Sequence, residues 1–224
     1  MATQEKEALF DVFATVAKAL SSGRRAELVD VLAQGERSVD SLASEINQSL
    51  ANTSQHLQVL ARAGLILSRR DGNRVLYRIA DESVEELWTA LRAVAAERVA
   101  GAEQVAAAYL GDRTGLEQVS RDELAQRLGD GVLVWDVRPP AEFEAGHVPG
   151  AVSVPPEELQ RRLDEVPDDV EVVAYCRGPF CVYADDAVRA LTSRARRARR
   201  LEDGFPEWRR SGLPVAFGAE GNDQ

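Results

Sequence analysis

The apolar residues near the start of the chain recur in steps of three and four, which is the spacing of one face of an α-helix. They are Leu9, Phe10, Phe13, Val16, Ala17 and Leu20. Further helices are predicted over residues 24–33, 39–46 and 50–63, with Ser38 as the N-cap of the middle one. The last helix is expected to bury Leu50, Thr53, Leu57 and Leu60. Two short helices separated by a tight turn at residues 47–49 have the spacing of a helix-turn-helix.

The pattern then changes to alternation, which is typical of strands. Residues 65–70 and 74–79 predict a β-hairpin, or wing, with Asp71 and Gly72 as its turn. From Ser83 to Tyr109 a helical stripe resumes over about seven turns. A helix this long on a small domain needs a partner surface, so we expect a homodimer formed through the N-terminal helix and the Ser83–Tyr109 helix.

The second half alternates between helices and strands, which predicts a parallel α/β sheet. The expected helices are 122–128, 156–163, 182–193 and 206–210, and the expected strands are 132–137, 170–175 and 199–201. Ser120 is the N-cap of the first of these helices, and residues 111–115 lack periodicity. The predicted organisation is a mainly α winged helix-turn-helix domain at 1–110, a linker at 111–117, an α/β domain with a central parallel sheet at 118–218 and a tail at 219–224.

Charge divides the chain in the same way. The formal net charge of −10 argues against nucleic acid, but residues 21–80 carry eight arginines against six acids, and the acidic excess lies after residue 80. No apolar run of about 18 residues occurs, and residues 1–8 lack an apolar leader segment, so a soluble cytoplasmic protein without a membrane partner is expected. The two cysteines, Cys176 and Cys181, indicate local thiol chemistry in a reducing compartment.

The first half resembles the ArsR family of winged-helix repressors. The resemblance covers about residues 9–109 and rests on LANTSQHLQVLARAGLIL at 50–67 and RRDGNRVLYR at 69–78. It implies that helix 50–62 enters the major groove of double-stranded operator DNA while the wing meets phosphates or the minor groove. The candidate DNA contacts are Asn52, Ser54, Gln55, His56 and Gln58 on the helix, and Arg69, Arg70, Arg74 and Arg78 on the wing.

These positions also have structural interpretations. His56 could be a surface or buried structural histidine, and the polar helix and wing residues could be a solvated face. Many relatives sense metal through cysteines on the helix that matches residues 39–46, but SVDSLASEI at 38–46 has none. Because both cysteines lie elsewhere, neither a metal site nor a cofactor is expected.

The second half resembles rhodanese-like domains. The resemblance spans about residues 119–217 and rests on DVRPPAEFEAGHVPGAVSVP at 136–155, YCRGPFC at 175–181, and LEDGFPEW at 201–208 followed by GLPV. It implies a catalytic loop between a strand and a helix. The candidate catalytic residues are Cys176, Arg177, Gly178, Pro179, Phe180 and Cys181, together with Asp136 and Arg138.

Residue chemistry supports Cys176 as the nucleophile. A thiol that follows a strand and precedes a helix meets backbone N–H groups and the positive end of a helix dipole, which stabilise a thiolate or persulfide. Thiosulfate-using members usually carry a basic residue at the end of the loop, where this chain has Cys181, so efficient thiosulfate turnover is not expected. Cys181 can instead attack a persulfide on Cys176 and give a disulfide or trisulfide.

Alternatives remain open for several of these residues. Cys176 could be an inert buried cysteine, Cys181 a small apolar residue at a helix start, and Asp136 with Arg138 a structural ion pair. His147 is expected to fix a turn rather than act as a base. The run Arg194, Arg196, Arg197, Arg199 and Arg200 is expected to be a solvated face, or else to attract anionic donors.

The function that the sequence favours is a DNA-binding repressor whose rhodanese-like domain senses or transfers sulfane sulfur through a persulfide on Cys176. The sulfur donor would be a small persulfide, polysulfide or thiosulfate. The alternatives are a sulfurtransferase enzyme, with the helix-turn-helix serving localisation or dimerisation, and a rhodanese fold that acts only as a binding module.

Overall fold

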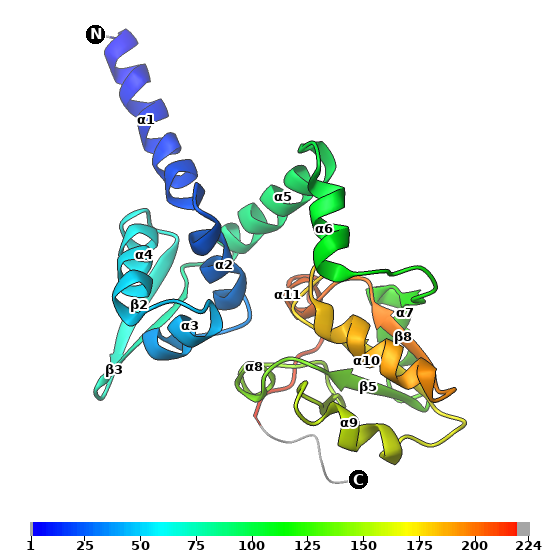
Figure 1. Cartoon of the computed structure of the whole chain (residues 1–224). Helices are drawn as coiled ribbons and strands as arrows, with labels where there is room; N and C mark the ends of the chain where they lie inside the picture. The colour runs from blue at the N-terminus through cyan, green and yellow to red at the C-terminus, as the bar shows by residue number, and fades with distance from the viewer. Residues whose placement is uncertain (1, 219–224) are drawn as a thin grey trace. The chain divides into compact units, whose positions relative to one another are not determined.

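A computed structural model of the chain describes residues 2–218, which fold into two compact units (Figure 1). One unit ends at Ala93 and the other begins at Val94, so the division falls inside helix α5 (Glu82–Arg98). No helix among residues 2–218 is both long and apolar enough to cross a bilayer.

The first unit is a winged helix, as the sequence predicts. Its helices are α1 (Ala2–Leu20), α2 (Gly23–Leu32), α3 (Val39–Glu45), α4 (Leu50–Arg62) and the first part of α5. The strands β1 (Arg37–Ser38), β2 (Ile66–Asp71) and β3 (Arg74–Ile79) form an antiparallel sheet in the order β1-β3-β2. Ser38 caps α3 by accepting a hydrogen bond from the Ser41 N–H. The core includes four fully buried leucines, Leu28, Leu42, Leu57 and Leu60, packed with valines and isoleucines.

Two local predictions in this unit are wrong. Leu50 is 49% exposed rather than buried, because it is the first residue of α4 and lies at the end of the helix, before the buried turns that hold Leu57 and Leu60. Asp71 pairs with Arg74 across the hairpin, so the turn residues are Gly72 and Asn73. Gly72 has φ 58°, a left-handed conformation that glycine adopts without steric cost and that tight hairpin turns require.

The helix predicted from Ser83 to Tyr109 is instead two helices. α5 ends at Arg98 and α6 (Ala102–Leu110) begins after Gly101, whose φ of 85° interrupts the helical backbone. The apolar residues keep their helical spacing on both sides of this break in the sequence, although most of them are exposed in the structure. Residues 94–110 group with the second compact unit, whereas the sequence pattern placed them in the first.

The second unit is a parallel α/β fold, also as predicted. Its strands are β4 (Gln118–Val119), β5 (Val132–Asp136), β6 (Val152–Ser153), β7 (Glu171–Tyr175) and β8 (Arg197–Leu201), in the parallel order β4-β8-β7-β5-β6. Its helices are α6, α7 (Arg121–Arg127), α8 (Pro140–Ala145), α9 (Leu159–Arg162), α10 (Val182–Ser193) and α11 (Phe205–Arg210).

Alternate residues of the central strands belong to two separate hydrophobic clusters, one on each face of the sheet. Val172 and Ala174 pack in the cluster that contains α10, whereas Val173 and Tyr175 pack in the cluster that contains Phe143 and Trp208. This double burial places the end of β7, where Cys176 follows, inside the fold.

Three features of this unit differ from the sequence prediction. The helix predicted at 156–163 is shorter, since α9 covers Leu159–Arg162 and a 3₁₀ turn follows at Leu163–Glu165. The short elements α8, β4 and β6 were not predicted, because two to six residues carry too little periodicity. Arg200 is buried rather than solvated, because β8 lies between β4 and β7 and directs alternate side chains into the fold.

Candidate functional sites

Helix α4 presents a polar face opposite its buried residues. Asn52, Gln55 and Gln58 are exposed, and Ser54 and His56 are half-buried. Thr53, Leu57 and Leu60 anchor the other side in the core. The side-chain amides of Asn52, Gln55 and Gln58 are therefore not packed in the core, and they can offer both hydrogen-bond donors and acceptors to base edges.

The wing does not present its four arginines on one surface. Strand register places Arg69, Arg74 and Arg78 on one face of the hairpin and Arg70 on the other. Arg69 forms a two-pronged ion pair with Glu36, with N–O distances from 2.5 to 3.0 Å. Arg78 donates to the carbonyls of Ile79 and Ala80, whereas the side chains of Arg70 and Arg74 are exposed. Contact of these residues with DNA stays a prediction.

The two cysteines of the second unit form a disulfide. Cys176 follows β7 and is 1% exposed, and Cys181 immediately precedes α10, with 6.2 Å between their Cα atoms. The bond closes a ring over residues 176–181. Inside the ring the Cys181 N–H donates to the Gly178 carbonyl at 3.2 Å, so this amide is committed to the loop backbone rather than to the Cys176 sulfur.

Two other side chains of the loop, those of Arg177 and Phe180, have different surroundings. Arg177 pairs with the fully buried Glu142 of α8, with an Nη2–Oε1 distance of 2.5 Å. Phe180 is 38% exposed, which places an apolar ring on the surface beside the cysteines. Since the Arg177 guanidinium is held by a carboxylate, it is not a ready partner for an anionic sulfur donor.

The LEDGFPEW motif at residues 201–208 contacts the backbone of the cysteine loop. The Phe205 N–H donates to the Cys176 carbonyl at 3.0 Å, and a Cβ on Gly204 would lie 2.3 Å from the carbonyl carbon of Arg177. Gly204 and Phe205 lie outside the site that the sequence predicts, although a glycine inside the LEDGFPEW motif is a signal of a close backbone approach.

A second support comes from the segment that the sequence assigned to a linker. Arg113 donates to the Pro179 carbonyl at 2.8 Å and to Asp185 at 2.5 Å. Asp185 is fully buried in α10 and also pairs with Arg200 at 3.1 Å. Sequence reasoning missed Arg113 because nothing in local periodicity marks an arginine that reaches a residue 66 positions away.

Asp136 and Arg138 form a fully buried ion pair, with an Oδ2–Nη2 distance of 2.5 Å. The Tyr175 hydroxyl donates to Asp136 at 2.6 Å. Burial opposes the charge on Arg138, but attraction to the Asp136 carboxylate outweighs it and holds the pKa of Arg138 above its ordinary value. Burial and the same carboxylate raise the pKa of Tyr175. Both side chains are fully buried, which fits a structural ion pair, and a chemical role for them stays a prediction.

His147 is fully buried, and its Nδ1 lies 2.9 Å from the Phe143 carbonyl. Its ring stacks on Phe143, and its backbone bridges to Ala216. Among the described residues, no group of three or more His, Cys, Asp or Glu side chains is placed to hold a metal ion.

A winged helix with an exposed polar recognition helix defines a DNA-binding regulator, and the parallel α/β unit with a cysteine after its central strand defines a rhodanese-like domain. Comparison with known protein families gives the same two assignments. Residues 22–68 match the family described as bacterial regulatory protein, arsR family, and residues 120–211 match the rhodanese-like domain. The chain is 45% identical over 218 residues to the HTH-type transcriptional regulator Rv0324 of Mycobacterium tuberculosis, covering 97% of this chain and 96% of that one.

Two further relatives each match one part. A sulfurtransferase of Allochromatium vinosum is 34% identical over 102 residues, covering 45% of this chain and 94% of that protein. A homodimeric winged helix-turn-helix DNA-binding domain from Mycobacterium bovis is 45% identical, covers 42% of this chain and 87% of its own, and has a TM-score of 0.40. The chain belongs to the ArsR family of DNA-binding transcriptional regulators and carries a C-terminal rhodanese-like domain.

Proposed function

We propose that this regulator is a repressor that responds to reactive sulfur through the Cys176–Cys181 loop. The observation that carries the proposal is the pairing of the two cysteines, which closes a ring between a central strand and α10 in a chain that also contains a DNA-binding unit. A thiol pair that can open and close gives the loop two covalent states.

The chemistry balances with a low-molecular-weight persulfide, R–S–SH, as the donor. The Cys176 thiolate attacks the terminal sulfur, the sulfur–sulfur bond of the donor breaks, and R–SH leaves as Cys176 becomes a persulfide. The Cys181 thiolate then attacks the Cys176 Sγ, which forms the disulfide and releases hydrogen sulfide. Two protein thiols are oxidised, and the transferred sulfur is reduced to sulfide.

Loop composition favours such a donor over thiosulfate. A dianion needs cationic groups at the mouth of the loop, but the Arg177 guanidinium is bound to Glu142 and the loop ends at Cys181. The exposed Phe180 ring offers an apolar surface for the carbon part of a thiol carrier.

Operator binding by a homodimer is the second part of the proposal. Phe10 and Phe13 of α1 are 59% and 58% exposed, and α1 and α5 line an apolar hollow of about 380 Å³ with Phe13, Leu87 and Leu91 among its residues. Exposed apolar surface of this kind favours burial against a second copy. The operator-bound dimer would act in the cytoplasm, where DNA and low-molecular-weight thiols meet.

The test uses operator fragments selected from genomic DNA by the reduced full-length chain. Affinity is measured by fluorescence anisotropy before and after treatment with inorganic polysulfide, for the wild type, Cys176→Ser and Cys181→Ser. We expect the wild-type affinity to fall by about tenfold, a coupling free energy typical of allosteric regulators. Cys176→Ser should not respond, and Cys181→Ser should accumulate a persulfide that intact mass spectrometry detects.

One control variant and one outcome decide the test. Gln55→Ala changes the polar face of α4 and should weaken binding in both states without altering sulfur chemistry. An unchanged wild-type affinity after complete oxidation of the cysteine pair would refute the regulatory proposal.

A sulfurtransferase enzyme is the second candidate, favoured by the similarity to the sulfurtransferase of Allochromatium vinosum. It predicts catalytic transfer of sulfur to cyanide or a thiol that Cys176→Ser abolishes. Many turnovers per chain, with no effect of polysulfide on operator affinity, would favour this candidate over the switch.

A further inference from the structure

The segment that follows α6 is fastened to the two-cysteine loop. Arg113 directs one donor to the Pro179 carbonyl inside the disulfide ring and another to Asp185, in the first turn of α10. A guanidinium suits this task, because its five N–H donors are fixed in a planar fork and can hold two acceptors at once.

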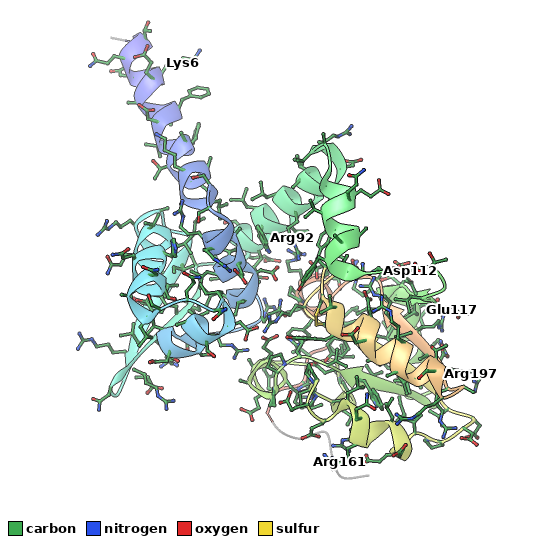
Figure 2. The ribbon with its side chains drawn as sticks, in the orientation of Figure 1. Lys6, Arg92, Asp112, Glu117, Arg161 and Arg197 are labelled. Carbon is green, nitrogen blue, oxygen red and sulfur yellow. A yellow bond between two sulfur atoms is a disulfide. The ribbon has the colours of Figure 1, made fainter. Side chains whose placement is uncertain are left out.

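The end of α6 itself is fastened to α10. Arg189 of α10 donates to the carbonyls of Leu110 and Asp112, the latter labelled in Figure 2, at 3.2 and 2.7 Å. Leu110 is the last residue of α6 and is 6% exposed. Residues 110–113 are therefore an ordered part of the second unit, and the chain leads from them through α6 to α5.

The arginines around Asp185 outnumber the carboxylates in direct contact with them. Arg113 and Arg200 share the buried Asp185 carboxylate, and burial together with the charge of Arg113 lowers the pKa of Arg200 despite that carboxylate. Arg113 consequently depends on the Pro179 carbonyl as its second acceptor, and a shift of that carbonyl alters the balance of the cluster.

We propose that Arg113 is the positioning residue that transmits the covalent state of the Cys176–Cys181 ring to the C-terminal end of α6. This inference rests on the proposed function and names the route of regulation. When the disulfide is reduced, the two sulfur atoms can no longer stay at bonding distance, so the loop backbone must relax. Because the Pro179 carbonyl belongs to the ring, this relaxation displaces it from Arg113 and loosens the hold on residues 110–113.

The test measures amide hydrogen exchange in the full-length chain, reduced and disulfide-bonded, over residues 102–110. In the wild type we expect exchange to be about fivefold faster in the reduced state, the change that corresponds to the net contribution of one hydrogen bond. Arg113→Lys keeps a charge beside Asp185 but loses the planar fork, and should abolish most of this difference. Arg113→Gln provides a second variant that removes the charge.

Arg161→Gln is the matched control, because Arg161, labelled in Figure 2, forms exposed ion pairs with Glu158 and Glu165, which flank α9. It should keep the wild-type difference, and intact mass spectrometry should show the disulfide forming in every variant. Retention of the full difference in both Arg113 variants would overturn the inference.

Operator affinity separates this inference from the proposed function. If polysulfide alters wild-type affinity while exchange in α6 stays constant, the switch exists but Arg113 does not transmit it. If neither quantity changes, the proposed function fails. If Arg113→Lys still oxidises but no longer alters its operator affinity, both proposals are supported.

Discussion

Gly204 lies against Arg177 so closely that a side chain has no place between them. An added Cβ would stand 2.3 Å from the Arg177 carbonyl carbon and equally close to the Gly178 nitrogen. The φ of Gly204 is −126°, an ordinary extended value, so the requirement for glycine is steric rather than conformational. The C-terminal motif therefore acts as a template for the backbone of the cysteine loop.

Gly204→Ala should displace the loop and slow closure of the Cys176–Cys181 disulfide. We expect a loss of stability of about 1–3 kcal/mol, the usual cost of overpacking a close contact, measured by chemical denaturation alongside the rate of disulfide formation. Gly23→Ala is the control, because nothing lies within 4 Å of its added Cβ. Unaltered stability and oxidation rate in Gly204→Ala would show that the loop backbone yields easily.

Glu36→Gln should strengthen DNA binding. The carboxylate neutralises Arg69 on the wing, and its removal would free one cation for phosphate contact. We expect the slope of log affinity against log salt to steepen by about one, measured by anisotropy titrations across salt concentrations. Glu27→Gln, which breaks the pair with Arg24 on α2, should leave the slope unchanged. The same slope in Glu36→Gln and wild type would exclude Arg69 from the interface.

Arg200→Gln should destabilise the second unit by about 3 kcal/mol, because removing one partner of a buried ion pair leaves its charge undercompensated. In this variant Asp185 still forms its ion pair with Arg113, so the expected loss of stability lies at the lower end of the range for broken buried ion pairs. Arg194→Gln in the same arginine run should cost less than about 0.5 kcal/mol, since its pair with Asp164 is exposed. Equal melting temperatures for the two variants would contradict the prediction.

Glu171 should contribute stability that depends on pH. Burial alone would raise the pKa of Glu171, but hydrogen bonds from Arg127 and Arg199 outweigh it and lower that pKa. A lowered folded-state pKa gives stability that is complete above the unfolded pKa, about 4.3, and is lost as pH falls through the folded value. The stability difference between wild type and Glu171→Gln should thus be largest near neutral pH and shrink in acid. A stability difference between the two proteins that grows as the pH falls would contradict this prediction.

The sequence by itself determined the two domain types and most of their elements. Helices α2, α3, α4 and α10 follow from periodic apolar residues and caps such as Ser38, and both buried strands β5 and β7 follow from short apolar runs. These signals are local, because the apolar periodicity and the capping residues of a helix or strand can be recognised within a short stretch of sequence. The pair of cysteines bounding a strand–loop–helix segment was visible for the same reason.

Only the tertiary structure decided which distant residues support the loop. Gly204 and Arg113 reach residues 176–181 from far along the chain, and the burial of Arg200 depends on β8 lying between β4 and β7. The break at Gly101 was also hidden, because the apolar stripe continues on both sides of it. Such contacts depend on strand order and close packing, which no local period encodes, so the thiol chemistry could be read from the sequence while its supports could not.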